Sequence, residues 1–106
     1  MLMPDIHTIY QLSNAEIVGE LGAMFRTYRI NANLTQQEVA EQAGISTVTL
    51  RSFEGGKAAN ITMGNFLACL RVIRRLEAVA DLLPEQPVSP YTLSQKNTKQ
   101  RVRHGK

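Results

Sequence analysis

A short stretch, TVTLRSF at positions 47–53, places two kinds of side chain at helical spacing. Leu50 and Phe53 fall on one side of such a helix and suit a protein core. The other side carries an arginine, which can donate two hydrogen bonds to guanine, with hydroxyls that bond to any base and methyl groups that fit the thymine methyl. The pattern predicts a helix that reads base edges in the DNA major groove. The residues that we expect to touch bases are Thr47, Val48, Arg51 and Ser52.

Four further residues are placed to hold the DNA backbone. Free N–H groups at helix N-termini, amide side chains and lysines are common phosphate ligands. Gln36 and Ser46 stand at the starts of two predicted helices, and the loop after the second helix carries Lys57 and Asn60. The outward side of the 47–53 stretch contains no acid, which suits contact with phosphates. The apolar positions alone would also fit ordinary packing between helices. The prediction that the partner is double-stranded DNA therefore rests on the polar side.

The sequence shows no grouping of residues that indicates an enzyme or a metal site. His7 and His104 lie near opposite ends, and there is a single cysteine, Cys69. A lone cysteine excludes an internal disulfide and fits a reducing compartment. Its apolar neighbours predict that it fills space in a core. We therefore expect no catalytic residue, no metal and no cofactor.

Charge and hydropathy describe a cytoplasmic protein with a basic end. No apolar run approaches the roughly 20 residues of a membrane span, and the first residues lack the pattern of a secretory signal. Residues 1–94 carry a net charge of −2, whereas residues 95–106 carry five cations and no acid. A short cationic tail fits attraction to nucleic acid and equally fits a solvated chain end.

Repeated helix-start signals predict the elements that position these residues. A hydroxyl residue followed three positions later by a glutamate forms a capping box, and this occurs at Ser13 and at Thr35. Ser46 and Thr62 are hydroxyl caps of the simpler kind. Four such starts within about fifty residues predict an all-α domain.

The predicted helices span 13–29, 35–43 and 46–54, followed by a fourth from about Thr62 and a fifth over 76–83. Gly44 ends the second helix, and no Gly or Pro separates the last two, so one bent helix is an alternative. Met24 and Met63 are assigned to the core. No stretch shows a convincing strand pattern, and an edge strand over residues 6–10 in a dimer is kept as an alternative. The predicted divisions are an arm over 1–12, a DNA-binding domain over 13–83, and a linker with a basic tail over 84–106.

Residues 21–73 resemble the phage-repressor-like, Cro/XRE-type helix-turn-helix family. The matching run is LGAMFRTYRINANLTQQEVAEQAGISTVTLRSFEGGK. The resemblance implies a five-helix lambda-repressor-like domain that binds operator DNA as a twofold dimer, and a structural ion pair between Arg29 and Glu54. It also implies the base and phosphate contacts named above, apart from Asn60. The family often has glycine after the fourth helix, where this chain has Arg74 and Arg75.

Two functions of different class follow from these observations. The first is a transcriptional repressor that binds a palindromic operator as a homodimer, with half-sites about 34 Å apart. The second is an antitoxin, because the run LPEQPVSPYTLSQKNTKQRVR resembles tails of HipB-like regulators that neutralise HipA-like toxin kinases. In that case the fifth helix and the tail would contact the toxin. The apolar strip of the fifth helix also fits a homodimer face or a core; its members are Leu76, Val79, Leu82 and Leu83.

Overall fold

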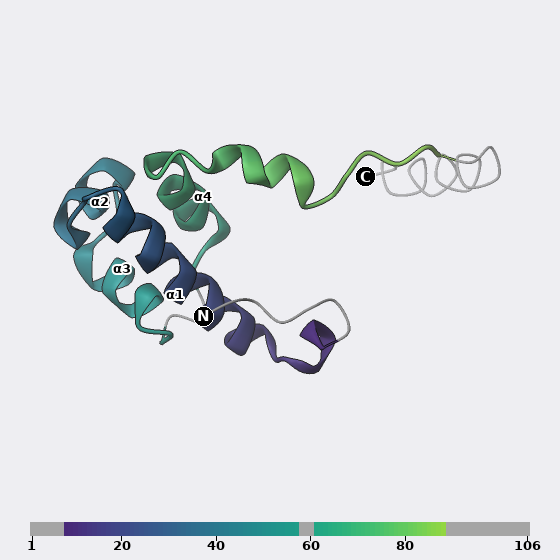
Figure 1. The fold of residues 1–106 in the computed structure, drawn as a ribbon, viewed down its shortest axis with the longest axis horizontal. Helices are drawn as coiled ribbons and strands as arrows, with labels where there is room; N and C mark the ends of the chain where they lie inside the picture. The colour runs from purple at the N-terminus through teal and green to yellow at the C-terminus, as the bar shows by residue number, and fades with distance from the viewer. Residues whose placement is uncertain (1–7, 58–60, 89–106) are drawn as a thin grey trace, which may run out of the picture.

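The computed structural model describes residues 8–57 and 61–88, and these residues form helices without any strand (Figure 1). Two short 3₁₀ helices, η1 (Ile9–Gln11) and η2 (Leu76–Asp81), flank the α-helices. The α-helices are α1 (Asn14–Asn31), α2 (Gln36–Ala43), α3 (Thr47–Glu54) and α4 (Met63–Val72). The all-α prediction is confirmed, with the fifth helix as a 3₁₀ segment.

Hydroxyl side chains begin all four α-helices, as the sequence predicts. The Ser13 hydroxyl accepts from the N–H of Glu16 at 3.1 Å, and the Glu16 carboxylate accepts from the N–H of Ser13 at 2.8 Å. Thr35 and Glu38 form the same reciprocal pair at the start of α2. The caps of α3 and α4 are single bonds, from Thr49 N–H to Ser46 and from Asn65 N–H to Thr62. Each cap satisfies a backbone donor that the helix itself leaves unpaired.

At the end of each α-helix, one residue adopts the left-handed conformation. The N–H of the next residue donates to the carbonyl five positions earlier in the chain. The N–H of Ile45, for example, donates to the Ala40 carbonyl at 3.0 Å, and the N–H of Arg75 to the Leu70 carbonyl at 2.9 Å. This is the Schellman closure. The left-handed residues are Asn33 (φ 61°), Gly44 (φ 73°), Gly56 (φ 79°) and Arg74 (φ 61°).

The junction after α4 resolves the alternative of one bent helix. Arg74 takes the left-handed conformation that the family often gives to glycine, at a steric cost that glycine would avoid. The α-helix therefore ends between α4 and η2, although the sequence has no Gly or Pro there. Because η2 is a 3₁₀ helix, its side chains follow a three-residue repeat instead of the expected α-helical stripe.

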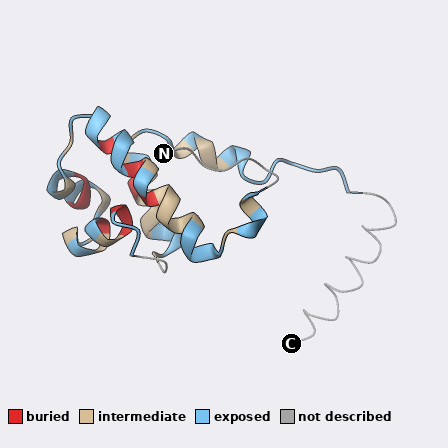
Figure 2. Cartoon of the chain, turned by 60° about the horizontal axis from the view of Figure 1, so that its bottom comes forward, coloured by how far each residue is buried: buried red, intermediate tan, exposed pale blue. Residues whose placement is uncertain are grey.

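The core lies where α1 crosses α3 and where α2 packs against α3 and α4 (Figure 2). The Phe53 ring lies 5.9 Å from that of Phe25 and 5.8 Å from that of Phe66, the second pair edge to face. Such contacts between aromatic rings stabilise a core beyond the area they bury. The fully or nearly fully buried apolar residues are Phe25, Val39, Ala40, Leu50, Phe53 and Cys69.

One prediction and one alternative for the rest of the chain are wrong. Met63 is 65% exposed instead of buried, because it occupies the first position of α4 on the side away from the core. The alternative of an edge strand over residues 6–10 fails at Ile9–Gln11, which form η1; its local 3₁₀ bonds use backbone groups that a strand would pair across chains. Residues 6 and 7 lie outside the described part of the chain.

Candidate nucleic-acid interface

The turn between α2 and α3 fixes the direction of the second helix. Gly44 adopts φ 73° and ψ 31°, a conformation that costs glycine nothing. The chain leaves α2 there and begins α3 after only Ile45 and Ser46. Val39 and Ala40 of α2 are buried at the crossing, so the two helices meet closely. A link this short between crossed helices is typical of the helix-turn-helix unit.

The inner side of α3 is held by the core. Leu50 is 0% exposed and Phe53 is 1% exposed. Because these side chains are inaccessible to solvent, rotation of α3 about its axis would expose large apolar groups. The opposite side of the helix is therefore presented outward in a defined orientation.

We call the outward side of α3 the α3 ridge; it consists of Thr47, Val48, Arg51 and Ser52. Val48 is 65% exposed and Arg51 is exposed, while Thr47 and Ser52 are half-buried at its edges. Within the described residues, the guanidinium of Arg51 has no hydrogen bond or ion pair. The four predicted base-contacting residues are thus brought together on an accessible surface.

The predicted phosphate-contacting residues differ in how free they are. The Ser46 hydroxyl accepts from the N–H of Thr49 and donates to the Thr49 hydroxyl at 2.8 Å, so its cap occupies it. The Gln36 amide donates to Glu54 Oε1 at 3.0 Å. Lys57 is exposed just beyond α3. Asn60 lies outside the described residues.

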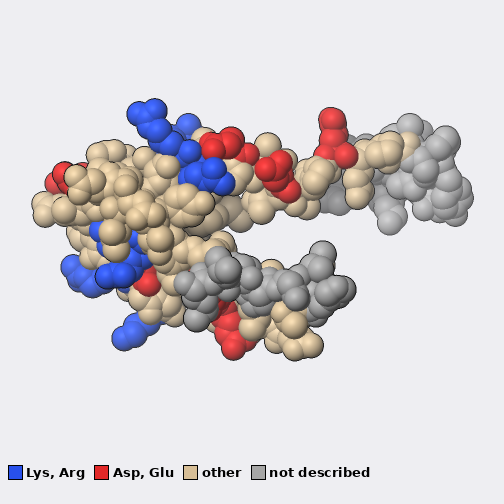
Figure 3. Space-filling model, viewed as in Figure 1, with Lys and Arg blue, Asp and Glu red and all other residues tan. Residues whose placement is uncertain are grey.

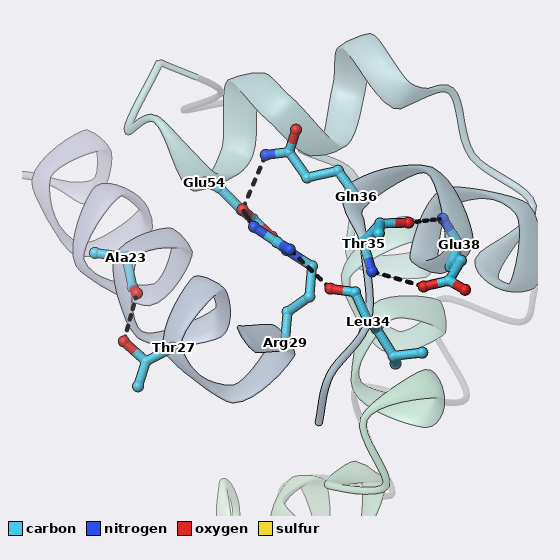
Figure 4. Close-up of polar contacts among 8 residues, drawn as sticks. All are labelled: Ala23, Thr27, Arg29, Leu34, Thr35, Gln36, Glu38 and Glu54. Atoms are coloured by element: carbon cyan, nitrogen blue, oxygen red, sulfur yellow. Dashed lines mark hydrogen bonds and ion pairs between the residues drawn. The ribbon is translucent and has the colours of Figure 1, made fainter. Parts of the chain in front are cut away.

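A buried ion pair supports the start of α2 and the end of α3 (Figure 4). Arg29 Nε donates to Glu54 Oε2 at 2.7 Å, and Arg29 Nη2 donates to Glu54 Oε1 at 2.9 Å. Arg29 Nη1 donates to the carbonyl of Leu34 at 2.8 Å. Arg29 is 9% exposed and Glu54 is 6% exposed. The expected pair is therefore present, and through Gln36 it links three helices behind the α3 ridge.

Arg26 is a candidate that the sequence reasoning did not assign to DNA. It is exposed and has no side-chain partner among the described residues. It lines an open hollow of about 450 Å³ together with Asn33 and Gln36, beside the N-terminus of α2. A free cation next to free helix N–H groups favours anions. In the sequence, the signal that could have identified Arg26 as a DNA contact is its position one helical turn before Arg29.

The described residues contain no group of three His, Cys, Asp or Glu side chains that would hold a metal ion. None of the described helices has the length and apolar character needed to cross a membrane. Cys69 is fully buried, as expected. Burial raises the pKa of its thiol from the ordinary 9.0 to about 11, and the negative charge of Glu54 adds to the effect.

Comparison with known families agrees with this geometry. Residues 20–83 match the family model described as a helix-turn-helix domain, which is of the Cro/XRE-like type. The match covers α2, α3 and α4 completely, with most of α1 and all of η2. No curated protein matches the chain.

Proposed function

This chain belongs to the helix-turn-helix domain family, and we propose that it is a sequence-specific transcriptional regulator that represses promoters by binding a palindromic operator as a homodimer. The family accounts for DNA binding in general. Beyond DNA binding, we propose which residues contact bases, that the protein binds as a dimer, and that it represses transcription.

One observation carries the proposal: the α3 ridge is accessible while the other side of the same helix is sealed in the core. Val48 and Arg51 project from the surface, and Leu50 and Phe53 have almost no exposure. A free arginine beside a free methyl-bearing side chain suits guanine next to thymine in the major groove. Arg29, by contrast, is buried and bonded to the carboxylate of Glu54.

The phosphate contacts follow from what surrounds the ridge. The N-termini of α2 and α3 each leave backbone N–H groups without a partner inside the helix, and the Gln36 side chain stands at the start of α2. Lys57 extends the contact beyond α3, and Arg26 adds a cation near α2. Asn60, which lies outside the described residues, remains a proposed phosphate ligand from the sequence alone. Such contacts set the register of the protein on the duplex without reading sequence. In the cytoplasm, a dimer bound to a promoter would then exclude other proteins from that promoter.

Selection from a random pool of DNA duplexes with the purified full-length chain tests this function. We expect enrichment of a palindrome whose half-sites have centres 10–10.5 base pairs apart, or a multiple of this spacing. A variant with Val48→Ala and Arg51→Ala, both at exposed positions, should keep the fold and lose the enriched sequence. Recovery of unrelated sequences by the wild-type chain would contradict sequence-specific binding.

A second candidate function is that of an antitoxin that binds a partner toxin and autoregulates its operon. The observation in its favour is the exposure of Leu82 and Leu83, which are 63% and 90% accessible. Most of the tail that carries the resemblance lies outside the described residues. The test is to purify the chain from its native host. This function would be supported if a protein kinase co-purifies with the chain and is lost when Leu82 and Leu83 are replaced. Rescue of growth when this chain is produced with that kinase would separate neutralisation from mere association.

A further inference from the structure

An open hollow lies where the C-terminal ends of α2 and α4 meet, and none of its lining residues belongs to the α3 ridge. It has a volume of about 500 Å³. Ala43 of α2 and Ala68 and Val72 of α4 form its apolar part, and all three are half-buried. Arg71 and Arg74 supply its charge. The hollow therefore combines a small apolar surface with two cations.

The two arginines of this hollow have no partner. Among residues 8–57 and 61–88, neither guanidinium forms a hydrogen bond or an ion pair, and both residues are exposed. Their neighbour Arg75 differs, because its guanidinium lies 5.5 Å from the centre of the Tyr28 ring and donates to Glu77 at 3.4 Å. Arg71 and Arg74 are therefore the cations of this segment that are available to a ligand.

The backbone conformation of Arg74 indicates that its side chain has a use. Arg74 has φ 61°, which is sterically costly for a residue with a Cβ atom and free for glycine. At the end of α2 the same left-handed position is filled by Gly44, with φ 73°. Residues held in such a conformation are found preferentially at functional sites. A glycine would also end α4, but it would supply no guanidinium to the hollow.

The charges beyond the hollow limit the size of a partner. Figure 3 shows cationic side chains where α4 passes into η2, and acidic ones farther along the same segment. The acidic residues are Glu77, Asp81 and Glu85, and all are exposed. A DNA duplex carries one charge per roughly 1.7 Å of its axis, so a duplex along this face would meet the acidic side chains as well as the arginines. A short acidic segment can pair with the arginines alone.

We propose that this hollow binds a short acidic segment of a partner protein. Carboxylates of the segment accept hydrogen bonds from Arg71 and Arg74, since a planar guanidinium offers a carboxylate two parallel donors. An aliphatic side chain of the segment covers the apolar part of the hollow and removes it from water. The inference goes beyond the proposed function, because this contact leaves the α3 ridge free. A chain bound to DNA would then hold a second protein at the promoter.

Fluorescence anisotropy with a labelled synthetic peptide and the full chain tests the proposal. The first probe carries one leucine between two pairs of glutamates. We expect saturable binding, and binding weaker by roughly tenfold or more in the variant with Arg71→Ala and Arg74→Ala. A second probe, with glycine in place of leucine, should bind the wild-type chain more weakly, because it leaves the apolar part of the hollow uncovered. Equal affinity for the two probes would overturn the proposed fit.

The variant with Arg26→Ala and Arg51→Ala is the matched control. It also removes two exposed arginines without a partner among the described residues, so the net charge changes by the same amount. This variant should bind the first probe as the wild-type chain does. If both double variants lose the same affinity, or if neither does, the peptide is attracted to charge outside the hollow and the proposal is wrong. Circular dichroism establishes that each variant is folded.

Single substitutions of Arg74 separate a binding role from a structural one. Arg74→Gly removes the cation and the steric cost together, so we expect a higher melting temperature and weaker binding of the first probe. Arg74→Ala keeps the Cβ atom in the left-handed conformation, so it should weaken binding without the rise in melting temperature. A melting temperature of Arg74→Gly below that of the wild-type chain would show that the fold itself needs this arginine, which would overturn the inference.

The double variant of Arg71 and Arg74 also distinguishes two other occupants. Unchanged peptide binding with weaker binding to duplexes of every sequence would assign the two arginines to the DNA backbone. A change in sedimentation without peptide would assign them to a second copy of this chain, and either result would overturn the proposal. We expect the double variant to select the same DNA sequences as the wild-type chain. Failure of that selection with the wild-type chain itself would count against the proposed function and would leave the peptide result intact.

Discussion

Gly22 of α1 lies directly against the backbone carbonyl of Phe53 in α3. A methyl group added to Gly22 would stand 1.8 Å from the Phe53 oxygen and 2.8 Å from its carbonyl carbon. This contact lets α1 lie close behind α3, so the helix that carries the proposed base-contacting residues is supported by backbone as well as by side chains.

The first prediction concerns this contact. Gly22→Ala should lower the free energy of unfolding by at least about 1–3 kcal/mol, since the clash is with backbone that cannot move aside easily. Gly64→Ala is the control, because Gly64 of α4 has nothing within 4 Å of an added methyl group. That substitution should raise stability by up to about 1 kcal/mol through helix propensity. Urea denaturation followed by circular dichroism measures both, and equal effects would contradict the close approach.

The second prediction concerns the pair of Arg29 and Glu54. Arg29→Met or Glu54→Leu alone should cost about 3–5 kcal/mol, because the remaining charge stays buried without its partner. The double variant should lose less than the sum of the two, with a coupling of up to about 3 kcal/mol. The measurement is a double-mutant cycle on the free energy of unfolding. Additive losses would mean that the two side chains do not stabilise each other.

The third prediction separates base contact from phosphate contact. Arg51→Ala should weaken binding to the selected operator by about 1–3 kcal/mol and relax the preference at one base pair. Lys57→Ala should weaken binding to all duplexes alike and reduce the salt slope by about one charge. Fluorescence anisotropy on the operator and on single-base variants distinguishes them. If Arg51→Ala binds every duplex as the wild-type chain does, this arginine does not read sequence.

The fourth prediction concerns residues 95–106, which lie outside the described part of the chain. Their five cations would each release counterions on contact with DNA phosphates. Deletion of the tail should therefore flatten the dependence of affinity on salt by up to about five charges. Titrations at several salt concentrations measure the slope. An unchanged slope would assign the tail to solvent or to a protein partner.

The fifth prediction follows from the raised pKa of Cys69. Since its folded pKa of about 11 exceeds the ordinary 9.0, the folded state holds the thiol proton more tightly than the unfolded state does. The contribution to stability is complete below pH 9 and falls as pH rises from about 9 through 11, by about 2–3 kcal/mol. The difference in unfolding free energy between the wild-type chain and Cys69→Ala across this range isolates the thiol. A constant difference would contradict the shift.

Structural features that depend on residues three to five positions apart could be predicted from the sequence. The caps at Ser13, Thr35, Ser46 and Thr62 and the closure at Gly44 bond to backbone only a few positions away, so residue type and spacing suffice to predict them. The separation of Leu50 and Phe53 from the α3 ridge follows in the same way from helical periodicity. The pair of Arg29 and Glu54, 25 residues apart, was implied only by family resemblance.

The tertiary structure decided what depends on distant neighbours. The sequence alone determined an all-α chain with a helix-turn-helix whose second helix has one apolar and one polar side. Only packing decided that Gly22 meets Phe53, that Met63 stays in solvent, and that Gln36 bonds to Glu54. The physical reason is that a local pattern shows which side of a helix is apolar, whereas the partner of that side is chosen by the helices that fit against it.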